Sequence, residues 1–148
     1  MHVTILLCDA AQVADGKLYV LGWGWSFTGP EPSPQAIAMR FDVAGTELGT
    51  SHHWELFLED QDGQPVVLDQ PDGTSVPIEV RGDFEVPKSR DIVAGVPVSV
   101  PVALHFGPLP IAPGGRYNWR LLVDGETDES WRVSFSTRAL PEQEPEGA

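Results

Sequence analysis

The segment YNWRLLV, Tyr117 to Val123, places a large apolar side chain at every second position and runs directly into Asp124-Gly125. Alternation with a period of two is typical of a β-strand that buries one face and exposes the other. An Asp-Gly pair after such a run is a strong signal for a tight hairpin turn. The segment therefore predicts a strand of an antiparallel sheet, with Trp119 on the buried face and Leu122 on the polar face.

The same alternation recurs along most of the chain, in the ranges 17–27, 37–43, 54–58, 76–86, 98–106 and 131–136. Turn signals such as Asp15-Gly16 and Asp62-Gly63 separate these runs, and no segment has the period of an amphipathic helix. Half-polar strands belong to antiparallel sheets with one solvated face. We therefore predict an all-β protein, an antiparallel β-sandwich of about eight or nine short strands, immunoglobulin-like or jelly-roll-like.

Some segments carry a more specific expectation. Val3 to Cys8 is apolar on both faces, which predicts a central strand or one covered on both sides. Pro97 and Pro101 predict an edge strand, because proline cannot donate to a sheet ladder. Residues 1–138 are expected to form one domain, and residues 139–148 an acidic disordered tail. In the range 17–27 the alternation places one set of side chains toward the core: Tyr19, Leu21, Trp23, Trp25 and Phe27.

The chain is strongly acidic. Its 148 residues include 22 Asp and Glu against 9 Lys and Arg, which gives a formal net charge of −13 and a pI of about 4.4. Such a surface repels phosphate backbones and anionic lipids, so we expect no nucleic-acid or membrane partner and favour cationic ones. The single cysteine, Cys8, leaves no internal disulfide, and the apolar run around it is too short for a signal peptide. We therefore expect a soluble cytoplasmic protein with Cys8 buried.

Two resemblances accompany these patterns. The stretch from Pro113 to Trp119 resembles the entry to a late strand of immunoglobulin-like and fibronectin-like sandwiches, which implies that the Tyr117 hydroxyl anchors the preceding loop. The whole chain is also similar to a family of small uncharacterised actinobacterial proteins, a domain of unknown function. That similarity implies a bacterial, non-secreted protein and transfers no catalytic residue. The matching stretches are Leu7 to Ala11, Gly16 to Gly22 and Gly107 to Pro110.

Catalytic motifs are missing from the sequence. It contains no Gly-x-Ser-x-Gly elbow and no glycine-rich phosphate loop, and its carboxylates are too numerous for spacing to select an acid and a base. His52 and His53 are adjacent on a strand and so point to opposite faces, with His52 on the Trp54 side and His53 on the Glu55 side. The segment Asp60 to Gly63 is explained better by a hairpin turn than by a calcium loop. We expect no enzymatic activity, no cofactor and no metal.

Four residues are candidates for binding. Trp25, with Trp23, could stack on a carbohydrate, although its periodicity favours the core. His53, Phe57 and Leu122 fall on polar faces, and the two apolar ones could form a patch for another subunit. The favoured function is a non-enzymatic binding or assembly module, acting through a protein partner or self-association. The alternatives are a carbohydrate- or calcium-binding sandwich, and an enzyme with a site that matches no motif.

Overall fold

The structure of this protein, a computed structural model, describes residues 1–142. This part of the chain is built from strands, with two single turns of 3-10 helix, η1 (Gly45–Glu47) and η2 (Glu129–Trp131). The strands are β1 (His2–Cys8), β2 (Ala10–Ala14), β3 (Lys17–Leu21), β4 (Phe27–Thr28), β5 (Gln35–Val43), β6 (Ser51–Asp60), β7 (Val67–Asp69), β8 (Ser75–Pro77), β9 (Glu79–Glu85), β10 (Val98–Phe106), β11 (Arg116–Val123) and β12 (Arg132–Thr137).

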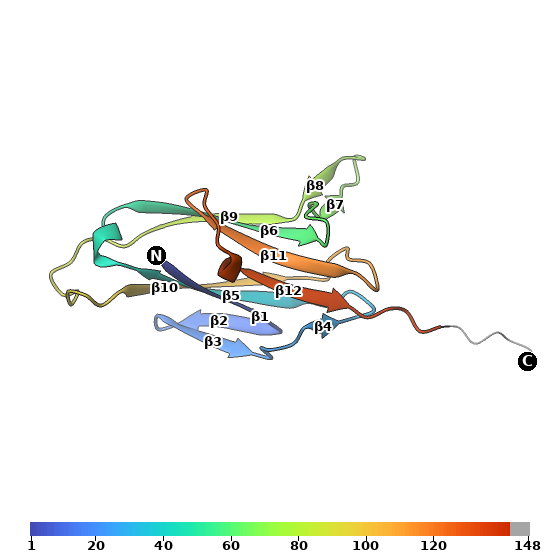
Figure 1. The fold of residues 1–148 in the computed structure, drawn as a ribbon, viewed down its shortest axis with the longest axis horizontal. Coiled ribbons are helices and arrows are strands. Elements are labelled where there is room, and N and C mark those ends of the chain that lie inside the picture. The colour runs from blue at the N-terminus through green and yellow to red at the C-terminus, as the bar shows by residue number, and fades with distance from the viewer. Residues whose placement is uncertain (143–148) are drawn as a thin grey trace, which may run out of the picture.

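These strands form three stacked layers and one projecting hairpin (Figure 1). A five-stranded sheet, in the order β4-β12-β11-β6-β9, faces a three-stranded sheet, in the order β1-β5-β10. The β2–β3 hairpin is the third layer, and the β7–β8 hairpin projects at one end. All pairings are antiparallel except that of β4 with β12. The all-β prediction is confirmed. The described residues hold twelve strands divided among four sheets, more than the eight or nine strands of the predicted sandwich.

The main core lies between the five-stranded and three-stranded sheets. On β11 the predicted alternation is confirmed, because Tyr117, Trp119, Leu121 and Val123 are all buried. Trp119 stacks on Phe106 with ring centroids 4.6 Å apart, and its indole N–H donates to Gln35 Oε1 at 2.8 Å. This hydrogen bond satisfies the polar end of the largest fully buried side chain.

A second, smaller core joins the β2–β3 hairpin to the outer face of the three-stranded sheet. Its buried members are Cys8, Ala11, Ala36 and Ala38. Small side chains on both layers let the hairpin approach the sheet closely. β1 is therefore covered on both sides, as its apolar faces predicted, although it lies at the edge of its sheet and is not central. Burial raises the pKa of the Cys8 thiol above its ordinary value, and the neighbouring Asp9 adds to the shift.

The range 17–27 departs from its prediction. β3 ends at Leu21, and Gly22 and Gly24 adopt positive φ angles of 67° and 103°, which break the alternation. Leu18 and Val20 pack against the small core, where the alanine layer suits aliphatic side chains. The opposite face points to solvent, so the expected core positions of four residues are wrong: Tyr19, Leu21, Trp23 and Phe27 are exposed.

The turn and edge predictions agree with the structure. Asp15-Gly16 joins β2 to β3 and Asp124-Gly125 joins β11 to β12, and both aspartates have φ near 51°, as a type I′ turn requires. Pro101 lies in β10, one of the two edge strands of its sheet. The Tyr117 hydroxyl accepts a hydrogen bond from the backbone N–H of Ala112 at 2.8 Å, the anchoring contact that the resemblance implied. Of the predicted tail, residues 139–142 lack regular structure and residues 143–148 lie outside the described range.

Candidate functional site

The outward face of the β2–β3 hairpin carries large apolar side chains in contact with solvent. Tyr19 and Leu21 project from β3, and Trp23 follows two residues later in the loop. Their exposed fractions are 52%, 70% and 66%. We call these three residues the aromatic patch. Tyr19 and Leu21 line one hollow on the same face of β3, and Trp23 is exposed two residues further along the chain. Large exposed apolar side chains gathered in one segment mark a candidate binding surface.

The hairpin holds the aromatic patch in a fixed place. The backbone N–H of Asp9 donates to the carbonyl oxygen of Leu21 at 3.1 Å. The backbone N–H of Ala11 donates to Nε2 of His105, a residue of β10, at 3.3 Å. A shallow hollow of about 350 Å³ lies beside Tyr19 and Leu21, with His105 and Gln12 in its lining. The patch thus combines exposed side chains with an ordered backbone.

An acidic side chain adjoins the aromatic patch. A methyl group placed on Gly22 would collide with the carboxylate of Asp9, so that carboxylate lies directly against the loop between Leu21 and Trp23. Asp9 itself is exposed. The neighbourhood therefore offers an apolar surface with a negative rim, in a chain whose net charge is −13.

Phe57 and Leu122 lie on the outer face of the five-stranded sheet, where the sequence placed them, but both are half-buried. The Arg120 guanidinium stands over the Phe57 ring, 5.6 Å from its centroid, and donates to Glu59 at 2.6 Å. Leu122 pairs in register with Glu55. The Arg120 guanidinium covers the Phe57 ring and Leu122 is half-buried, so neither side chain is fully open to solvent.

The two histidines face opposite sides of β6, as predicted. His53, on the outer face, pairs with Asp83 at 2.7 Å and with Glu55 at 3.1 Å, and the Asp83 contact raises the pKa of His53 above its usual value. His52 is buried, and its Nδ1 lies 2.8 Å from Asp124, which raises the pKa of His52. Its other ring nitrogen is 3.3 Å from the backbone oxygen of Glu47. These contacts tie neighbouring strands and turns together, which gives both histidines a structural role.

Trp25 is half-buried and packs edge-on against Phe135, with centroids 5.9 Å apart. Its indole nitrogen is buried and has no hydrogen-bond partner in residues 1–142. The exposed tryptophan of this segment is therefore Trp23 and not Trp25. The sequence prediction assigned the wrong face of β3 to the core, which misplaced Tyr19 and Leu21. It also extended the alternation past Gly22 and Gly24, which misplaced Trp23 although these glycines could have signalled the end of the strand.

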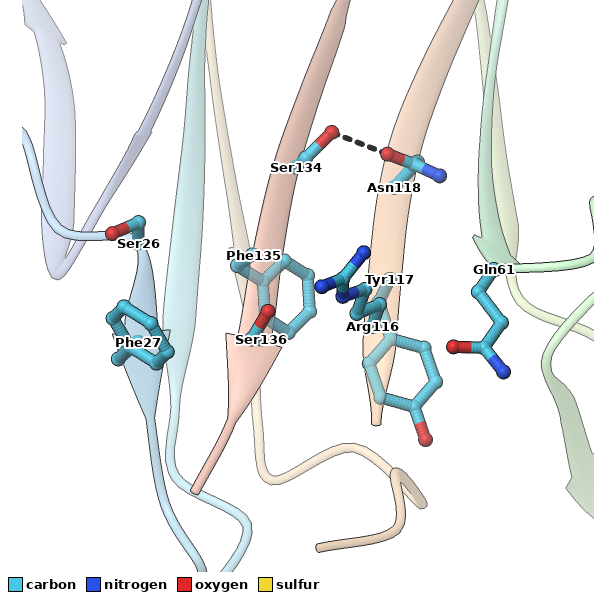
Figure 2. Close-up of a pocket in the computed structure, with 9 residues that line it drawn as sticks. All are labelled: Ser26, Phe27, Gln61, Arg116, Tyr117, Asn118, Ser134, Phe135 and Ser136. Carbon is cyan, nitrogen blue, oxygen red and sulfur yellow. Dashed lines mark hydrogen bonds between the residues drawn. The ribbon is translucent and has the colours of Figure 1, made fainter. Parts of the chain in front are cut away.

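A second hollow runs over β4, β12 and β11. In Figure 2, Phe27 and Gln61 stand at its two ends, with Ser136 and Arg116 between them. The hollow measures about 440 Å³, and the hydroxyl of Ser134 donates to the amide oxygen of Asn118 within it. It therefore combines an exposed aromatic ring with several polar side chains.

The loop at Asp60 has the geometry of a turn. One carboxylate oxygen of Asp60 accepts the backbone N–H groups of Asp62 and Gln64, both at 2.9 Å. This use of an aspartate side chain is typical of an Asx turn. Across residues 1–142, no group of three or more His, Cys, Asp or Glu side chains is arranged to hold a metal ion. In the same range, no helix is long and apolar enough to cross a membrane.

These observations define an all-β protein with exposed apolar side chains on and next to a hairpin that packs over the three-stranded sheet. Residues 3–135 match a family described as "Family of unknown function (DUF6941)", and the chain belongs to that family. Neither the curated proteins nor the solved structures include a significant match to the chain. Membership of an uncharacterised family agrees with the resemblance seen in the sequence.

Proposed function

We propose that this protein is a non-enzymatic binding module that docks a protein partner through the aromatic patch. The observation that carries the proposal is the exposure of Tyr19, Leu21 and Trp23 on a hairpin whose other face is packed into the protein. Aromatic side chains on a rigid support are typical anchors of protein interfaces. Burying each such side chain contributes about 1.5–3 kcal/mol, enough for a modest contact after association entropy is subtracted.

The charge of the chain indicates what kind of partner fits. Asp9 lies at the rim of the patch, and the whole chain carries a formal charge of −13. A partner with an apolar centre and basic side chains around it complements this surface. A second copy of the chain brings the same negative charge, so the proposal favours a different protein over self-association.

The test compares patch and sheet-face variants as baits. Wild-type protein, a Tyr19→Ser/Trp23→Ser variant and a Phe57→Ser control are used for affinity capture, and each captured protein is then purified and titrated against all three. We expect direct binding by the wild type and by the control, with loss in the patch variant. A partner that binds the patch variant as well as the wild type refutes the proposal, as does a wild-type bait that captures no direct binder. Light scattering at low and high salt measures self-association separately.

A carbohydrate ligand is the second candidate, and the hollow of Figure 2 supports it. A flat aromatic ring, Phe27, lines the same hollow as Ser136 and Arg116, a combination suited to stacking against a sugar ring and to hydrogen bonding its hydroxyls. The test is a glycan array with the wild type and with Phe27→Ala. A glycan bound only by the wild type supports this function, whereas no glycan signal from the wild type removes it.

We also propose two finer assignments. The two larger sheets form a sandwich of the immunoglobulin-like kind, and the bond from Ala112 to the Tyr117 hydroxyl supports this. The protein acts in the cytoplasm, which the single buried cysteine supports. An experimental structure and cell fractionation, respectively, test these assignments.

A further inference from the structure

A cleft opens between the tip of the β2–β3 hairpin and the outer face of the three-stranded sheet. At the other end of the hairpin, the alanines of the small core hold the two layers together. Toward the tip the layers enclose a cleft of about 470 Å³. Its lining comes from the hairpin and from all three strands of the sheet, β1, β5 and β10.

The lining combines apolar walls with positive charge. Leu6 of β1 and Leu18 and Val20 of β3 are half-buried and face the cleft. Lys17 enters it from the hairpin and Arg40 from β5. Two of the nine basic residues of this acidic chain therefore line one cleft. Cavities of about 300–1,000 Å³ with apolar walls and a few polar groups are typical sites for small molecules.

Both basic side chains keep donors for a ligand. Arg40 pairs with Asp42 through Nε at 3.1 Å and Nη2 at 3.2 Å. Within residues 1–142, neither Nη1 of Arg40 nor the Lys17 ammonium forms an ion pair or hydrogen bond. The Asp42 carboxylate offsets the charge of Arg40, so Lys17 supplies the remaining positive charge of the cleft. At physiological ionic strength, acidic groups more than about 8 Å away are largely screened.

We propose that this cleft binds a small organic carboxylate with an apolar body. The carboxylate accepts charge-assisted hydrogen bonds from Lys17 and Arg40, and the apolar body lies against Leu6, Leu18 and Val20. The cleft is on the inner face of the hairpin, whereas the aromatic patch is on its outer face. The two proposals are therefore independent.

Octanoate is the probe, titrated calorimetrically into the full chain, with amide chemical shifts used to locate it. Octan-1-ol lacks the carboxylate and acetate lacks the apolar body, so each is expected to bind at least about tenfold more weakly. Lys17→Met is expected to weaken octanoate binding up to about fivefold, the effect of one partly exposed charge pair. Lys88→Met makes the same charge change away from the cleft and is the matched control. Thr4→Phe fills the cleft and is expected to abolish binding.

The proposal is supported if octanoate shifts the amides of β3 and β5 around the cleft and Lys17→Met alone of the two lysine variants weakens binding. It is overturned if octanoate does not bind, if octan-1-ol binds equally well, or if the two lysine variants behave alike. Shifts confined to the Trp23 loop would place octanoate on the aromatic patch and also overturn it. If Thr4→Phe fails to fold, the octanoate affinities of Lys17→Met and Lys88→Met still test whether the cleft is the binding site.

Discussion

Replacing Gly82 by alanine is expected to destabilise the protein through a collision in the main core. Gly82 lies in β9, in register with Trp54 of β6. A Cβ atom on Gly82 would lie 2.5 Å from Cζ2 and 2.6 Å from Cε2 of the Trp54 indole. Carbon atoms in favourable contact are about 3.5–4.0 Å apart, so either the ring or the strand must move by about 1 Å.

The surroundings of Trp54 limit that movement. Trp54 is buried and tilts against Phe41 with centroids 6.3 Å apart, and Phe41 packs on Phe84 at 4.9 Å. Inserting a methyl group into a packed core costs about 1–3 kcal/mol. We expect Gly82→Ala to lower the free energy of unfolding by about 2 kcal/mol, which for a chain of this size lowers Tm by about 6–8 °C.

Urea denaturation and thermal unfolding measure this change. Gly107→Ala is the matched control, because a Cβ there meets no atom within 4 Å, and we expect its effect to stay within about 0.5 kcal/mol. In a Trp54→Phe background the ring is smaller, so Gly82→Ala should cost less than in the parent. The reasoning is refuted if Gly82→Ala is as stable as the parent, or if it costs the same in both backgrounds.

Three further predictions concern single contacts. Tyr117→Phe removes the hydroxyl that accepts the Ala112 N–H and should cost about 1 kcal/mol in urea denaturation, and an unchanged midpoint would mean that the loop is held by other contacts. His52 has a raised pKa and Asp124 a lowered one, because each pairs with the other. Their stabilisation should be lost as pH rises through the raised His52 pKa or falls through the lowered Asp124 pKa. The Asp124→Asn variant keeps a side chain that tolerates the positive φ at this position. Its free energy of unfolding should therefore fall furthest below that of the parent at pH values between those two pKa values. A stability difference that does not change with pH would contradict the pairing. Cys8 is buried with a raised pKa, so a thiol reagent should label it only after denaturant is added, and immediate labelling would place it at the surface.

The sequence was most informative where a strand alternates against one core. Tyr117 to Val123 and Ser51 to Asp60 each bury one face toward the same large core, so period two located their inward residues. Asp-Gly pairs located turns because a type I′ turn needs positive φ at both central positions. These signals are local in the sequence, so they can be interpreted without knowing the order of the strands in the sheets.

The candidate site was not predictable in the same way. The outward direction of Tyr19 depends on which face of β3 meets the alanines of β5, and that contact joins segments far apart in sequence. The strand β2 carries mostly small residues, so its alternation is weak and it was not predicted at all. The side chain of Phe57 was placed on the correct face, but its cover by Arg120 comes from the neighbouring strand. The exposure of these side chains therefore depends on how the strands pair and pack, which the sequence pattern alone does not give.

The alanine-lined contact beneath the β2–β3 hairpin has a consequence for hydrogen exchange. Only four residues of the described chain form that buried cluster, whereas β5, β6 and β11 share the large core. The hairpin can therefore open as a unit at a lower free-energy cost than global unfolding, and its amides should exchange through that partial opening. A molecule that binds only the closed hairpin, on either face, stabilises the closed form and slows this exchange. Two such molecules would increase each other's affinity, because each of them disfavours the same opening step, although they do not touch.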